Sequence, residues 1–154
     1  MNAMTARALR AGRVRDVMQM QMVTVVPEMT VRELAQTLLD SGIRSAPVLD
    51  PAGKVLGLAT QADVTRMAFG ADRALVLVEG DDSRSDEDER TAARADVLRV
   101  RDVMGPVGDT VGSDEPLAEV VRRFLRGRVN QLLVVDHGML LGIVTPVDVL
   151  GQVL

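Results

Sequence analysis

The stretch GLATQAD, residues 57–63, returns 85 residues later as GIVTPVD, residues 142–148. Each copy has a glycine, two apolar residues, a threonine and, three positions after the threonine, an aspartate. Threonine and aspartate at this spacing are typical of a helix N-terminus, where the threonine caps the first turn and the aspartate complements the helix dipole. The apolar residues before each threonine favour a strand. The pattern therefore predicts a strand that runs directly into a helix, twice in one chain.

The repetition extends outward from these two stretches. Three further pairs align at an offset of 86 residues: VRDVM at 14–18 and 100–104, TVRELAQTLLDSG at 30–42 with PLAEVVRRFLRGR at 116–128, and APVLD at 46–50 with LLVVD at 132–136. The offset falls to 85 in the turn that follows, where the second copy is one residue shorter. Two halves that share one plan indicate an internal duplication.

Each half contains an amphipathic helix with apolar residues at five equivalent positions. These are Val31, Leu34, Ala35, Leu38 and Leu39 in the first half and Leu117, Val120, Val121, Phe124 and Leu125 in the second. Their spacing places them on one face of a helix, and Thr30 with Glu33 predicts a capping box at the start of the first helix. A short helical turn and a strand come before this helix, and a hairpin and a last helix come after it. We therefore expect an α+β fold of two repeats related by a pseudo-twofold axis, each a small sheet packed on two helices.

The predicted organisation is an N-terminal tail (1–13), a first repeat (14–70), an inter-repeat segment (71–99) and a second repeat (100–154). The stretch EGDDSRSDEDER, residues 79–90, carries seven acidic and two basic residues, whereas the whole chain has a net charge of −4. Such a run is usually solvated, so the segment is expected to contain an acidic flexible linker. The run ALVLV, residues 74–78, fits a strand or a helix end equally well, and TAARADVL, residues 91–98, suggests a return to helix.

Composition limits the possible functions. Apolar residues make up 47% of the chain and aromatic residues 1%, so the core must be aliphatic. The absence of cysteine excludes disulfides, thiolate metal sites and cysteine nucleophiles. No apolar run approaches the roughly 20 residues of a membrane span, so a cytoplasmic protein without membrane contact is expected. The arginines at positions 122, 123, 126 and 128 favour a solvated helix face over a nucleic-acid site, because no aromatic residues are interleaved with them.

These elements occur twice in the same order, and together they resemble a tandem pair of CBS (cystathionine β-synthase) domains, a Bateman module. The resemblance rests on VRDVM, on TVVP at 24–27, on IRSAPV at 43–48 and on the repeated T-x-x-D, and it covers residues 14–67 and 100–153. It implies a stand-alone regulatory module that senses nucleotides, commonly a homodimer, and not an enzyme. The implied ligand is adenosine-containing (AMP, ADP, ATP or S-adenosylmethionine) and binds in clefts between the repeats. No obligatory cofactor or metal is implied, and the regulated protein is not identified.

The resemblance also assigns roles to residues. Asp63 and Asp148 would each hold the two hydroxyls of a ribose, beside Thr60 and Thr145. In the first half, Val26, Ala46 and Pro47 would contact the adenine, and the fork of Arg44 suits a phosphate. Asn130, Gln131 and Leu133 depart from the pattern in the second half, so the first site is expected to be the stronger. The complete predicted set is Thr24, Val26, Ile43, Arg44, Ala46, Pro47, Thr60 and Asp63, with Thr110, Val129, Thr145 and Asp148 in the second half.

Three alternatives remain open from the residues alone. A helix cap contributes about 0.5–2 kcal/mol, which explains both T-x-x-D copies without any ligand. Arg44 fits an exposed strand edge as well as a phosphate site. The apolar C-terminal stretch VLGQVL, residues 149–154, also suits a ligand-free scaffold for dimerisation or docking. Catalysis is not expected, because Asp63 and Asp148 belong to different clefts and make a poor acid–base pair.

Overall fold

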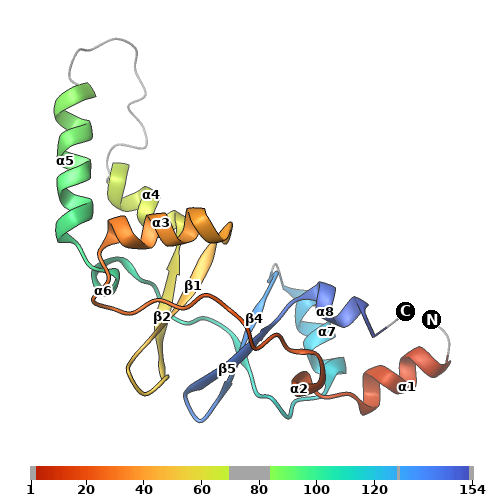
Figure 1. The fold of residues 1–154 in the computed structure, drawn as a ribbon. Coiled ribbons are helices and arrows are strands. Elements are labelled where there is room, and N and C mark those ends of the chain that lie inside the picture. The colour runs from red at the N-terminus through yellow and green to blue at the C-terminus, as the bar shows by residue number, and fades with distance from the viewer. Residues whose placement is uncertain (1–2, 70–83, 128, 153–154) are drawn as a thin grey trace. The chain divides into compact units, whose positions relative to one another are not determined.

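The computed structural model describes residues 3–69, 84–127 and 129–152 (Figure 1). The chain divides into two compact units. The first-repeat unit comprises Val23–Ala52 and Leu56–Val107, and the second-repeat unit comprises Met1–Met22, Gly53–Val55 and Gly108–Leu154. Each unit combines helices with a small sheet, so the α+β prediction is confirmed.

The first-repeat unit has a two-stranded sheet of β1 (Ser45–Leu49) and β2 (Val55–Thr60). Its helices are α3 (Val31–Ser41), α4 (Gln61–Phe69), α5 (Arg84–Val97) and α6 (Val100–Val103). The predicted capping box begins α3: Thr30 Oγ1 accepts from the Glu33 N–H at 3.1 Å, and the Thr30 N–H donates to Glu33 Oε2 at 2.9 Å. The aliphatic core consists of Val25, Leu34, Leu38, Ala46, Val48, Ala59 and Val100.

The second-repeat unit has a three-stranded sheet in the order β3 (Thr110–Val111), β4 (Leu132–Asp136), β5 (Met139–Val144). β3 is parallel to β4, and β4 is antiparallel to β5. The helices are α1 (Ala3–Ala11), α2 (Val14–Val17), α7 (Leu117–Arg126) and α8 (Pro146–Leu150). The core consists of Val14, Val111, Val120, Leu132, Val134, Val144 and Val149.

Each VRDVM helix packs in the unit of the other repeat, which the order of the sequence did not indicate. Val14 of α2 is fully buried in the second-repeat core, and its N–H donates to the Glu115 carbonyl at 3.0 Å. Val100 of α6 is fully buried in the first-repeat core, and its N–H donates to the Met29 carbonyl at 2.8 Å. The core of each unit is therefore completed by a helix that precedes the opposite repeat in the chain.

The glycine of each repeated stretch allows a close backbone approach. A β-carbon at Gly57 would lie 2.6 Å from the Gly105 carbonyl oxygen, and one at Gly142 would lie 2.7 Å from the Gln19 carbonyl oxygen. The approaching segments are held by paired backbone hydrogen bonds, between Leu58 and Gly105 and between Gln19 and Ile143. Glycine inside a strand often marks such an approach, and this explains why it opens both GLATQAD and GIVTPVD.

The less regular segments contain two helices. Helix α1 lies within the expected N-terminal tail and packs on α7, with Leu9 against the core. The return to helix predicted for 91–98 is confirmed by α5, which begins at Arg84 within the expected acidic linker and packs against α3 and α4 (Figure 1). Arg32 pairs with Asp96 across the contact between α3 and α5, and its hydrogen bond holds the pKa of Asp96 below the usual range. The run ALVLV lies outside the described residues.

The strand predicted at TVVP is reduced to a single parallel bridge between Val25 and Val48. The Val25 N–H donates to the Pro47 carbonyl at 2.9 Å, and the Leu49 N–H donates to the Val25 carbonyl at 2.9 Å. This segment therefore runs beside β1 and extends the small sheet by one position.

Candidate ligand-binding site

Asp63 lies at the junction of β2 and α4, where the sequence predicted it. Its Oδ2 accepts from both the N–H and the Oγ1 of Thr60 at 2.9 Å, and its own N–H donates to Thr60 Oγ1 at 3.1 Å. The capping interpretation is confirmed, and it uses only one carboxylate oxygen. Oδ1 accepts from Arg66 Nη1 at 3.3 Å. Among the residues that the structure describes, Asp63 is the one buried charged side chain, at 7% exposure.

The loop before β1 is tied to the same helix N-terminus. The Gln61 N–H donates to the Arg44 carbonyl at 2.8 Å, and Gln61 Nε2 donates to the Ile43 carbonyl at 3.1 Å. These bonds place Ile43 and Arg44 next to the Thr60–Asp63 cap. The Arg44 side chain is exposed, and no acidic partner for it occurs within the described ranges. The structure therefore brings together a buried carboxylate and an unpaired guanidinium.

Two of the three residues predicted to contact adenine are buried. Ala46 lies with Val48 in the core, and Pro47, between them in β1, is buried as well. Val25 is buried in the same core, whereas its neighbours Thr24 and Val26 are exposed, Val26 to 49%. Of the three, the structure therefore presents only Val26 to a ligand.

Asp148 repeats the cap at the junction of β5 and α8. Its Oδ2 accepts from the Thr145 N–H at 2.7 Å and from Thr145 Oγ1 at 2.9 Å. Its Oδ1, however, accepts from Gln19 Nε2 at 2.7 Å. The second carboxylate is therefore engaged on both oxygens by side chains and backbone of its own unit.

The other residues predicted for the second half have structural contacts. The Thr110 carbonyl, in β3, accepts from Arg123 Nη1 at 2.7 Å. Val129 packs against the second-repeat core. Asn130, at the position equivalent to Arg44, is exposed and carries no charge. The predicted residues thus form two groups, one in each unit, and only the first has a cationic side chain beside its cap.

Two residues that contact the carboxylates were missed at the sequence level. Arg66 lies three positions after Asp63 on α4, a spacing that predicts an ion pair on a helix surface, so a signal was present. Gln19 contacts Asp148 from 129 residues away, and no local pattern indicates this contact.

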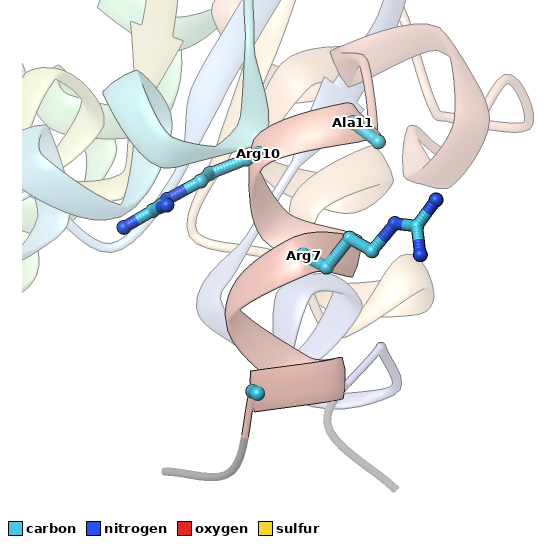
Figure 2. A pocket seen from close by; sticks show the side chains of 4 residues that line it. Arg7, Arg10 and Ala11 are labelled. Carbon is cyan, nitrogen blue, oxygen red and sulfur yellow. The ribbon is translucent and has the colours of Figure 1, made fainter.

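A hollow on the surface of α1 is a weaker candidate site. It is lined by Ala3, Arg7, Arg10 and Ala11. Figure 2 shows the Arg7 and Arg10 side chains extending away from one another. Because the two guanidinium groups diverge, they do not converge on a common ligand. The described residues also contain no group of three His, Asp or Glu side chains placed to hold a metal ion, and no described helix is long and apolar enough to cross a membrane.

Two small α+β units, each with a capped carboxylate at a strand–helix junction, define a tandem-repeat module. The family model for the CBS domain matches residues 14–70 and 100–154, so the chain belongs to the CBS domain family and carries two copies of the domain.

Solved structures agree with this assignment. The CBS domain of a CBS domain-containing membrane protein from Sphaerobacter thermophilus is 28% identical, with a TM-score of 0.72, and the match covers 97% of this chain and 93% of that one. CBSX2 in complex with AMP is 22% identical, with a TM-score of 0.67 and coverage of 92% and 95%. The CBS domain of a bacterial CNNM/CorC family Mg²⁺ transporter in complex with ATP is 18% identical, with a TM-score of 0.67 and coverage of 97% and 92%. In the curated relatives from Methanopyrus kandleri and Methanocaldococcus jannaschii, the aligned part is 27–40% of the relative's length.

Proposed function

We propose that this chain is a regulatory module that binds an adenosine-containing ligand, with the ribose held by Asp63. The observation that carries the proposal is the buried Asp63 carboxylate, which spends Oδ2 on the helix cap and presents Oδ1 to the exposed side chain of Arg66. AMP and ATP occur in complexes of structurally similar CBS-pair proteins. AMP, ADP, ATP and S-adenosylmethionine share the ribose that this carboxylate suits.

The ion pair with Arg66 is weak enough for a ligand to compete for Asp63 Oδ1. The Arg66 side chain is 64% exposed and its Nη1 lies 3.3 Å from Oδ1. An ion pair with such an exposed partner contributes at most about 1 kcal/mol. A ribose hydroxyl that donates to a charged acceptor gains roughly 1.5–3 kcal/mol. A ribose can therefore displace Arg66, or share Oδ1 with it.

The neighbouring residues suit the rest of a nucleotide. Arg44 is fixed beside the cap through its carbonyl, and its exposed guanidinium has the planar fork that binds phosphate oxygens in pairs. The exposed side chain of Val26 offers an apolar contact for the base. Ala46 and Pro47 are buried in β1 and do not contact the ligand. Thr24 and Ile43 complete the proposed site.

The proposed output is regulatory and not catalytic. A ligand that binds one conformation more tightly than another shifts the population toward it, and a partner protein can respond to that shift. The two carboxylates of the predicted set, Asp63 and Asp148, are engaged in helix caps, and they belong to different units. We therefore assign Asp63 to recognition of the sugar.

A ligand-free scaffold is the second candidate function, and exposed apolar side chains favour it. Leu125 of α7 is 82% exposed, and Val147 and Leu150 of α8 are 72% and 61% exposed. The helices α7 and α8 pack against each other, so these residues mark one region of the second-repeat unit. A second copy of the chain would cover them, and such a homodimer is compatible with either function.

Thermal denaturation with each of the four ligands tests the proposal. A ligand present at 100 times its Kd stabilises the folded state by about 2.7 kcal/mol, which raises the Tm of a chain of this size by roughly 5–11 °C. We expect at least one ligand to produce this shift in the wild type and a clearly smaller shift in Asp63→Asn, since asparagine keeps the capping ability and loses the charge. The Arg44→Gln substitution should weaken the binding of AMP more than the binding of adenosine, because adenosine has no phosphate. No shift with any of the four ligands at millimolar concentration would leave the scaffold function in its place.

A further inference from the structure

We propose that Gln19 closes the second ribose position from within the chain, so that this tandem pair has a single nucleotide site. This inference rests on the proposed function and extends it to the number of sites. Gln19 Nε2 donates to Asp148 Oδ1 at 2.7 Å, the oxygen that corresponds to the proposed ribose acceptor of Asp63. The Gln19 amide thus occupies the place that a ribose hydroxyl would take as donor.

The backbone of Gln19, from which the amide side chain extends, is held by hydrogen bonds. The Gln19 N–H donates to the Ile143 carbonyl at 2.8 Å, and the Ile143 N–H donates to the Gln19 carbonyl at 2.9 Å. This pair of bonds attaches the N-terminal segment to β5, two residues before the cap residue Thr145. The main chain of Gln19 is therefore already held, and only the side-chain rotamers have to be fixed when the hydrogen bond to Asp148 forms.

The first repeat has the same backbone arrangement without the side chain. Gly105 stands 86 positions after Gln19 and pairs with Leu58 in the same way, through N–H to carbonyl bonds of 2.9 and 3.0 Å. A β-carbon built on Gly105 would meet no atom within 4 Å. No side chain therefore extends from this position in the first repeat, and the space next to its α-carbon is open. The two carboxylates differ because glutamine stands at one equivalent position and glycine at the other.

The partners of the two Oδ1 atoms are also of different kinds. Arg66 reaches Asp63 from its own helix at 3.3 Å with a side chain that is 64% exposed. Gln19 reaches Asp148 at 2.7 Å from a paired strand segment. A hydrogen bond to a charged group is worth enough that losing it weakens binding about ten- to a hundredfold. A ribose that enters the second position has to break the Gln19 bond, and it should therefore bind weaker by that factor.

Calorimetric titration with AMP and ATP tests the inference by counting sites. Wild-type protein should bind one nucleotide per chain, and Asp63→Asn should weaken that binding about ten- to a hundredfold. The Gln19→Gly variant should bind two nucleotides per chain. The added site should disappear in the double variant that carries both Gln19→Gly and Asp148→Asn. The Gln19→Ala variant repeats the test without the added backbone freedom of glycine. The Gln21→Gly variant is the matched control, and it should still bind one nucleotide per chain. The reverse change, Gly105→Gln, should weaken the first site about ten- to a hundredfold.

The outcomes separate the two proposals. Two wild-type sites, or a single site in both Gln19 variants, would overturn the role of Gln19 and leave the Asp63 site intact. Absence of AMP and ATP binding in the wild type and in both Gln19 variants would overturn the nucleotide function and the inference with it. Binding by the Gln19 variants alone, at Asp148, would support the closure by Gln19 and overturn the assignment of the site to Asp63.

Discussion

Replacing Gly57 by alanine should destabilise the protein by about 1–3 kcal/mol. The new β-carbon would lie 2.6 Å from the Gly105 carbonyl oxygen and 3.0 Å from Met104 Sδ, so the segment after α6 has to move. That movement stretches the two hydrogen bonds between Leu58 and Gly105, which measure 2.9 and 3.0 Å. At roughly 0.5–1.5 kcal/mol for each bond, the loss is about 1–3 kcal/mol, which matches the usual cost of overpacking.

Thermal and urea denaturation measure this loss, and Gly105→Ala is the matched control. The expected fall in Tm for Gly57→Ala is roughly 2–12 °C, at about 2–4 °C per kcal/mol for a chain of this size. A β-carbon on Gly105 meets open space, and its backbone is outside the left-handed region, so the control should be neutral or up to about 1 kcal/mol more stable. Equal stabilities for the two variants would refute the close approach as the reason for the repeated glycine.

Two further predictions concern acid stability and association. The Ser113 hydroxyl, followed by the Ser113 N–H, holds the pKa of Asp136 below its usual value, so this contribution to stability is complete above about pH 4 and is lost as the pH falls through the lowered pKa. The Ser113→Ala variant should be less stable than the wild type at pH 7, and its stability should fall less when the pH is lowered to 3. Urea denaturation of both proteins at pH 7 and pH 3 measures this. An equal loss of stability in the two proteins would contradict it. Leu125→Glu should shift a dimer toward monomer in sedimentation velocity. An unchanged dimer in Leu125→Glu would exclude α7 from the interface.

Local patterns were sufficient for much of the fold. The spacing of apolar residues located α3 and α7, and threonine–acid pairs located the caps at Thr30, Thr60 and Thr145. These features depend on contacts between residues three or four positions apart, so they are visible in the sequence. The two hairpins were visible for the same reason, because their turns connect neighbouring strands.

Contacts over long sequence separations were not predictable. Packing of Val14 and Val100 in opposite units depends on where the chain crosses, which no periodicity records. The acidic first part of helix α5, residues 84–90, was taken for linker, whereas the part from Thr91 was expected to be helical; α5 as a whole packs against α3 and α4, which its composition does not show.

The candidate site was predicted in outline and corrected in detail. Thr60, Asp63 and Arg44 come together as expected, because the loop before β1 bonds to the start of α4. Ala46 and Pro47 are both buried in β1, with Ala46 in the core beside Val48, and the sequence alone could not show this burial. The Gln19–Asp148 bond required the three-dimensional structure.

Binding of AMP and 2′-deoxy-AMP to wild-type protein and Asp63→Asn tests the central claim most directly, because it asks whether this carboxylate holds the ribose diol. Removing the 2′-hydroxyl from the ligand should weaken binding to the wild type about ten- to a hundredfold. In Asp63→Asn the same change should have little further effect, since the hydroxyl no longer has a charged acceptor. An equal loss in both proteins, or none in the wild type, would contradict the assignment of Asp63 to the ribose.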